Sequence, residues 1–199
     1  MVSQSLLGEK MEEIIYNDDQ QHKVIKTYYH EETGEYRVLV QIGMNEFCPT
    51  EFIIEDIDKF HARVEAKREY LVDWIKDFNG SENIFVKQKG ISDWKYAKDL
   101  PKELEGFELY INPEKSLEIT NGSFVIINYV DFKINSDLVI YYNMFSDDFG
   151  SEMRIKGNSV VTYDFDAESL EKLEEKLKLK LNDQLKFVRE AAISEGNNE

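Results

Sequence analysis

The stretch SFVIINYVDFKINSDLVIYYNMF, residues 123–145, has the densest β-branched and aromatic content in the chain. Such residues favour strands, and the polar tetrad at 133–136 divides the stretch into two halves. The pattern predicts two long antiparallel strands joined by a tight connection. Side chains alternate along a strand, so Phe124 and Ile126 point to one face while Val125 points to the other. Because both faces are apolar, we expect this strand to be central in its sheet and covered on both sides.

Two segments have the apolar spacing of amphipathic helices. The first is residues 58–78, with Asp58 as the expected N-cap. The second begins after Asp166, the expected N-cap there, and its apolar stripe consists of Leu170, Leu173, Leu177, Leu181, Leu185, Val188 and Ala192. Leu179 falls opposite this stripe, so we expect it to be exposed unless a partner covers it.

Shorter strand candidates lie on either side of the first helix. They are residues 24–29, 36–42, 83–87, 107–111, 116–120, 153–156 and 159–163. Residues 88–106 form a long irregular loop, a kind of segment that often binds ligands or partners. The chain is therefore predicted to be α+β, with a mostly antiparallel sheet of six to nine strands and two long amphipathic helices. We expect one domain over residues 1–199, frayed at 1–10 and 194–199.

The composition restricts the partners that this protein can bind. Forty acidic residues against 24 basic ones give a net charge of −16, which repels phosphate backbones and anionic membranes. We therefore expect neither direct nucleic-acid binding nor membrane binding, and a basic protein as the favoured partner. The single cysteine, Cys48, excludes an internal disulfide. Without a signal peptide or a long apolar run in the sequence, the expected location is the cytoplasm.

Catalytic motifs are mostly absent: the chain has no GxxxxGK[ST], GxGxxG, GxSxG, HExxH or CxxC. One pattern, Asp131-Phe132-Lys133, is similar to the D/E-x-K half of a metal-dependent nuclease site, where an acid binds the cation and a lysine steadies the attacking water. A second acid could come from Asp99, Glu103 or Glu105. The competing interpretation is a strand that runs into a polar turn. We keep the nuclease as a secondary hypothesis and predict no cofactor and no metal.

The acidity and the long loop favour a binding protein over an enzyme. Acidic clusters speed encounter with a basic partner, and aromatic side chains dominate interface energetics. The residues expected to bind a partner are Trp94, Tyr96, Asp147, Asp148, Glu152 and Leu179. Alternatively, Trp94 and Tyr96 close the loop onto the core. The function predicted is a non-enzymatic inhibitor of bacterial or phage type, such as an immunity protein or an anti-defence protein that mimics DNA. The alternative is a small α+β protein that binds an apolar ligand.

Overall fold

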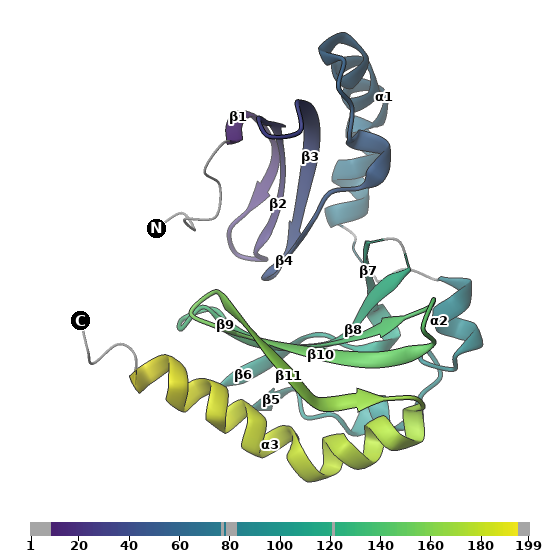
Figure 1. The fold of residues 1–199 in the computed structure, drawn as a ribbon, viewed down its shortest axis with the longest axis vertical. Coiled ribbons are helices and arrows are strands. Elements are labelled where there is room, and N and C mark those ends of the chain that lie inside the picture. The colour runs from purple at the N-terminus through teal and green to yellow at the C-terminus, as the bar shows by residue number, and fades with distance from the viewer. Residues whose placement is uncertain (1–8, 77, 79–82, 121, 195–199) are drawn as a thin grey trace. The chain divides into compact units, whose positions relative to one another are not determined.

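The computed structural model in Figure 1 describes residues 9–76, 78, 83–120 and 122–194. The chain, which the sequence predicts to be one domain, divides into two compact units, Met1–Asn79 and Gly80–Glu199, a division that does not test that prediction. We call them the N-terminal and the C-terminal unit and describe each by itself. The predicted fraying concerns residues that lie partly outside the described chain, because residues 1–8 and 195–199 are not described.

The N-terminal unit is a four-stranded antiparallel sheet, in the order β1-β2-β3-β4, with one long helix. Its elements are β1 (Glu9–Asp18), β2 (Lys23–His30), β3 (Glu35–Ile42), β4 (Asn45–Phe47), a 3₁₀ helix η1 (Thr50–Phe52) and α1 (Ile57–Lys76). The hairpin predicted from residues 24–29 and 36–42 is confirmed as β2 and β3, with Tyr29 opposite Tyr36.

Helix α1, predicted over residues 58–78, extends from Ile57 to Lys76. It begins one residue earlier, and the cap is Asp56 rather than Asp58, since the Asp56 Oδ1 accepts a hydrogen bond of 2.9 Å from the Lys59 backbone N–H. Both aspartates suit a cap chemically, and the hydrogen bond assigns the role to the first of them. The predicted apolar stripe does face inward, with Phe60, Val64, Leu71 and Ile75 buried.

The C-terminal unit is built on a seven-stranded antiparallel sheet, in the order β11-β10-β9-β8-β6-β5, with β7 paired to β8. The strands are β5 (Glu103–Leu104), β6 (Phe107–Ile111), β7 (Leu117–Thr120), β8 (Ser123–Asp131), β9 (Ser136–Asn143), β10 (Asp148–Ile155) and β11 (Asn158–Ala167). The predicted central hairpin is confirmed as β8 and β9. Every position of β8 after Ser123 is buried, so both faces of this strand are covered.

Helix α3 (Leu170–Ser194) packs on one face of this sheet, against β9, β10 and β11, as Figure 1 shows. Its predicted stripe is buried from Leu173 to Ala192 and forms the core together with the sheet residues Phe124, Ile140 and Phe165. The predicted N-cap, Asp166, is wrong because β11 continues to Ala167. Ser169 caps instead, through a hydrogen bond of 3.3 Å from the Lys172 N–H to its Oγ.

The first part of the C-terminal unit differs from its prediction. Residues 83–87, expected as a strand, form the short helix α2 (Ile84–Gln88), because the Asn83 side chain accepts a hydrogen bond from the Phe85 N–H and starts a helical turn. The segment 88–106, expected as an irregular loop, contains a 3₁₀ helix η2 (Lys95–Asp99) and β5.

The α+β class with mostly antiparallel pairing is confirmed. Within the described residues, however, the strands number eleven in two sheets, not six to nine in one, and α2 is a third helix. No helix in the described part of the chain has the length and apolar character required to cross a bilayer.

Candidate protein-binding surface

Trp94 and Tyr96, the two aromatic residues expected to contact a partner, attach the segment 88–106 to the core of the C-terminal unit. Trp94 is 8% exposed and donates from Nε1 to the Glu174 carboxylate on α3 at 3.2 Å. Tyr96 packs against Trp94 with ring centroids 5.6 Å apart, and the Lys178 ammonium lies 5.1 Å from the centre of the Tyr96 ring. These contacts favour the alternative interpretation, in which the loop closes onto the core, because a buried Trp94 presents little surface to a partner.

The acidic loop between β9 and β10 has a defined conformation, centred on Asp147. Lys89, just after α2, donates from Nζ to the Asp147 carboxylate at 2.6 Å and to its carbonyl oxygen at 3.0 Å. The Tyr142 hydroxyl donates to the same carboxylate at 2.9 Å. Asp147 has a φ of 56°, in the left-handed region that aspartate tolerates better than most residues. Three hydrogen bonds therefore fix a loop residue whose side chain is still 67% exposed.

These contacts change the protonation chemistry of the loop. The hydrogen bond from Lys89, followed by that from Tyr142, lowers the pKa of Asp147 below its ordinary value, so the carboxylate stays ionised. Burial, and then the bond to Asp147, raises the pKa of Tyr142 to about 12. The Lys89 ammonium also lies over the rings of Tyr142 and Phe149, 5.6 and 5.7 Å from their centres. This lysine is thus held by aromatic faces as well as by the carboxylate.

Exposed apolar side chains lie near the β9–β10 loop of the C-terminal unit. Phe145, in the loop itself, is 74% exposed, and on α2 Ile84 and Phe85 are 61% and 41% exposed. The Phe145 ring lies against Gly122, because a Cβ added to that glycine would come within 2.7 Å of the ring. Lys89 ties the end of α2 to this loop. We call the set Ile84, Phe85, Phe145, Asp147 and Asp148 the loop surface.

The structure brings together only two of the predicted acids. Asp148 is exposed next to Asp147 and accepts a hydrogen bond of 2.5 Å from the Ser146 hydroxyl. Glu152 lies four residues along β10, roughly 13 Å away at the rise of a strand, and accepts from the Ser159 hydroxyl at 2.6 Å. Leu179 is on α3 and is 77% exposed, as its position opposite the stripe predicts. Glu152 and Leu179 are therefore not part of the loop surface.

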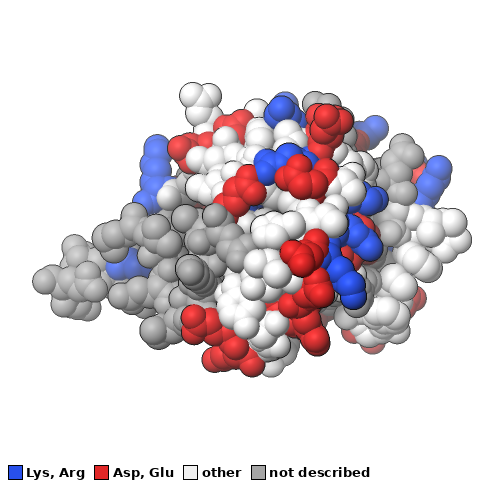
Figure 2. Space-filling view, turned by 90° about the horizontal axis from the view of Figure 1, so that it is seen from above, with Lys and Arg blue, Asp and Glu red and all other residues white. Residues whose placement is uncertain are grey.

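Other acidic clusters have local structural partners. Asp164 accepts hydrogen bonds from Lys180 at 2.5 Å and from Gln184 at 2.6 Å, and the bond from Lys180 lowers the pKa of Asp164. Asp56 caps α1. On the face seen in Figure 2, Asp and Glu side chains stand in several separate groups with Lys and Arg beside them, rather than in one continuous patch.

The nuclease-like pattern has a structural role in the fold. Asp131 is 7% exposed, and its two oxygens accept from the Lys133 backbone N–H at 3.0 Å and from the Arg189 guanidinium on α3 at 2.9 Å. The Lys133 side chain is exposed. Across the described residues, no group of three or more His, Cys, Asp or Glu side chains is placed to hold a metal ion. The geometry thus fits a strand that ends in a polar turn, held to α3 by an ion pair.

A second buried carboxylate, Asp137 on β9, is not among the residues that the sequence singles out. Arg154 of β10 donates from Nε to its Oδ1 at 2.7 Å and makes a second bond to Oδ2, and the Asn128 amide donates to Oδ2 at 2.8 Å. Burial raises the pKa of Asp137, and the bonds from Arg154 oppose this effect. Because both oxygens are occupied by fixed donors, we interpret Asp137 as part of the sheet structure.

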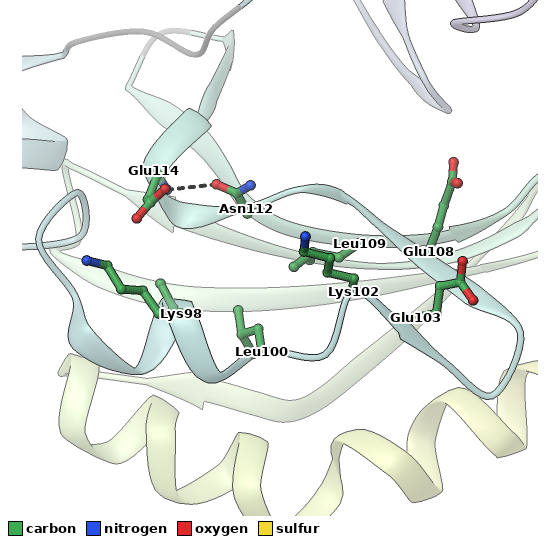
Figure 3. A pocket seen from close by; sticks show the side chains of 9 residues that line it. Lys98, Leu100, Lys102, Glu103, Glu108, Leu109, Asn112 and Glu114 are labelled. Atoms are coloured by element: carbon green, nitrogen blue, oxygen red, sulfur yellow. Dashed lines mark hydrogen bonds between the residues drawn. The ribbon is translucent and has the colours of Figure 1, made fainter.

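A pocket of about 380 Å³ lies between the η2–β5 segment and β6. Figure 3 shows Glu103 and Glu108 side by side at one end, with Lys98 and the turn of Asn112 and Glu114 at the other. Leu100 and Leu109 contribute the apolar part of its wall, and Lys102 a second ammonium group. A lining with charges of both signs does not match the apolar interior that the alternative function requires.

No protein-family model matches this chain, and neither the curated proteins nor the solved structures contain a significant match.

Proposed function

We propose that this protein acts by stoichiometric contact with a basic protein partner, through the loop surface. The observation that supports the proposal most is the fixed position of Asp147, held by Lys89 and Tyr142 beside the exposed ring of Phe145. An exposed aromatic ring next to ordered carboxylates combines the two contributions that protein interfaces use. The ring supplies buried area after contact, and the acids accelerate encounter.

The preformed loop reduces the entropic cost of binding. A side chain that is immobilised only on association costs about 0.5–1.5 kcal/mol, and Asp147 is already hydrogen-bonded in the free protein. The net charge of −16 favours a basic partner over an acidic one. A bacterial or phage inhibitor, such as an immunity protein or an anti-defence protein, is the class that we propose on these grounds. The residues that we propose for contact now include Phe145 in place of the buried Trp94.

The test has two stages and uses three variants of the full chain. Affinity capture from a lysate, with identification by mass spectrometry, gives candidate partners for the wild type. The same capture is then repeated with Phe145→Ala, with Asp148→Lys and with Glu69→Lys. Asp148 contacts only the Ser146 hydroxyl among the side-chain bonds described, so its reversal leaves the Lys89 contact intact. Glu69 is an exposed acid on α1 and matches the change in charge within the N-terminal unit.

Surface plasmon resonance on the captured partner separates the two contributions. We expect the association rate to fall steeply with salt, because the Debye length shrinks from about 8 Å at physiological salt to about 3 Å at 1 M. Asp148→Lys should slow association, Phe145→Ala should speed dissociation, and Glu69→Lys should leave dissociation unchanged. If association does not depend on salt and both loop variants bind like the wild type, the loop surface is not the interface. The exposed side of α3 around Leu179 would then be the next surface to mutate.

A further inference from the structure

The two edges of the seven-stranded sheet differ greatly in length. One edge is β5, which has two residues, and the other is β11, which has ten. Within the described chain, no strand pairs with the outer side of β11. Proteins commonly shorten or cover such edges, because unpaired N–H and C=O groups can pair with another chain. The β5 edge follows this rule, and β11 does not.

The register shows which backbone groups of β11 point outward. Strands β10 and β11 are joined by a two-residue turn, with Ile155 opposite Asn158. In such a hairpin the residues that flank the turn form a hydrogen-bonded pair, and bonded positions then alternate along the strand. The backbone N–H and C=O of Thr162 therefore point toward β10. This agrees with the Thr162 carbonyl oxygen accepting a hydrogen bond of 3.4 Å from the Ser151 hydroxyl. The N–H and C=O groups of Ser159 and Val161, and the N–H of Tyr163 that follows the last regular pair, consequently point away from the sheet.

An open groove of about 550 Å³ runs beside this edge, between β11 and α3. Met153 and Val160 line it from the sheet, and Phe187 lines it from the helix. Phe187 is 51% exposed, and the neighbouring Val161 and Tyr163 of the edge are 69% and 74% exposed. Val160 packs against the core, so the neighbouring Val161 and Tyr163 point to the opposite face of the sheet. Exposed apolar side chains therefore lie on both faces beside this unpaired edge.

The groove is closed at one end by bonds between β11 and α3. Lys180 and Gln184 donate to the Asp164 carboxylate, and Lys176 donates to the Asp166 carbonyl oxygen. An added strand therefore has room only along the portion of β11 before Asp164.

The surroundings of the open portion are acidic. Asp183 and Glu190 are both exposed on α3, four residues before and three residues after Phe187, which places them beside Phe187 on the helix surface. Glu152 is the cross-strand partner of Val161 on β10. Of the two lysines at the closed end, Lys180 is paired with Asp164 and Lys176 donates to the Asp166 carbonyl oxygen. Because side chains alternate along a strand, Glu152 lies on the face of the sheet opposite the groove. A strand added at this edge would thus have carboxylates near both of its faces, Asp183 and Glu190 on the helix side and Glu152 on the other.

We propose that the outer edge of β11 binds an extended basic segment of a partner protein, which pairs with Ser159, Val161 and Tyr163 as an additional strand. An apolar side chain of the segment packs on Phe187 in the groove, and lysine or arginine side chains reach Asp183 and Glu190. This recognition mode draws affinity from main-chain hydrogen bonds and specificity from alternate side chains. The inference goes beyond the proposed function, because it concerns a separate surface and the conformation of its ligand.

A second copy of the chain fits this edge less well. Pairing of β11 with β11 would bring Glu152, Asp183 and Glu190 of both copies together, in chains that each carry a net charge of −16. Like charges at an interface oppose association. A basic segment has no such penalty, so charge selects the basic segment as the occupant.

The test uses an acetylated short peptide of alternating lysine and valine, titrated into the full chain labelled with ¹⁵N. The matched control peptide alternates glutamate and valine. We expect the lysine peptide to shift the amide resonances of Ser159, Val161 and Tyr163 and to slow their hydrogen exchange, while the glutamate peptide leaves them unchanged. Size-exclusion chromatography without peptide checks for self-association.

Variants of the chain then identify the contacts. Val161→Pro removes one outward N–H without removing a bond to β10, a substitution that edge strands tolerate. It should weaken the lysine peptide about fivefold to tenfold, as loss of one hydrogen bond does. Phe187→Ala should also weaken binding, and Leu179→Ala, another exposed apolar position on α3, should not. The proposal is overturned if neither peptide shifts the β11 amides, if both peptides bind equally, or if Val161→Pro binds unchanged. Protection of these amides in a dimer without peptide would assign the edge to a second copy instead.

Discussion

The packing of α3 on the sheet predicts a large difference between two leucines that are two positions apart. Leu177 is 1% exposed and belongs to the core of the C-terminal unit, whereas Leu179 is 77% exposed on the same helix. Truncation of leucine to alanine removes roughly three methylene equivalents, each worth about 0.8 kcal/mol when buried. For Leu177 the transfer contribution is therefore about 2.4 kcal/mol, and the remaining cavity brings the loss of unfolding free energy to about 2–5 kcal/mol.

For Leu179→Ala the same calculation gives a small loss of unfolding free energy. With 77% of the side chain exposed, less than a quarter of the transfer energy is at stake, about 0.5 kcal/mol or less. Alanine also has a slightly better helix propensity than leucine, which offsets part of this loss. Leu179→Ala is thus a matched control, with the same change in chemistry on the same helix and nearly no burial.

The assay must report on one unit, because two units can give two unfolding transitions. Trp94 lies in the core of the C-terminal unit, and the other tryptophan, Trp74, lies on α1 of the N-terminal unit. In a Trp74→Phe background, urea unfolding followed by tryptophan fluorescence reports on the C-terminal unit alone. Equal losses for Leu177→Ala and Leu179→Ala would refute the one-sided burial of α3.

Three further predictions concern Asp164, Asp131 and the nuclease-like pattern. Lys180 holds the pKa of Asp164 below its ordinary value of 3.8, so the folded-state pKa is depressed and the stabilisation is present above that value. It is lost as the pH falls through the folded-state pKa, and Asp164→Asn should flatten the acid side of the stability profile measured by urea unfolding between about pH 2 and pH 6. Asp131→Ala should destabilise the C-terminal unit, because it leaves the Arg189 guanidinium without its carboxylate. The purified wild type should not cleave DNA or RNA with magnesium or manganese, and cleavage that both Asp131→Ala and Lys133→Ala abolish would restore the nuclease hypothesis.

Local patterns in the sequence predict the elements whose burial follows a regular repeat along the chain. The β8–β9 hairpin is predictable because β-branched and aromatic residues fill both faces of β8, and α3 because its leucines repeat on one face. The short run Ile84-Phe85-Val86 is not, since a short apolar segment does not distinguish strand from helix and the Asn83 cap decides the outcome. The predicted caps of α1 and α3 are wrong for a similar reason, because several residues near each helix start can act as the cap.

The candidate site is predictable only in part. Asp147 and Asp148 stand out by their acidity, but Phe145 does not, because its position depends on the packing of Gly122 beneath it. Trp94 is assigned to a surface because a long loop suggests exposure, whereas a contact with Glu174, eighty residues away in sequence, holds it inside. Such long-range contacts leave no local pattern in the sequence.

The contact between Lys89 and Asp147 has a consequence for how this end of the C-terminal unit opens. One ammonium group joins the end of α2 to the β9–β10 loop and also lies on the rings of Tyr142 and Phe149. Neither segment can leave its native position without breaking these interactions, so we expect α2 and the loop to exchange their amide hydrogens as one cooperative unit. A partner that binds the loop and suppresses its opening would then also protect the amides of α2, including those that it never touches.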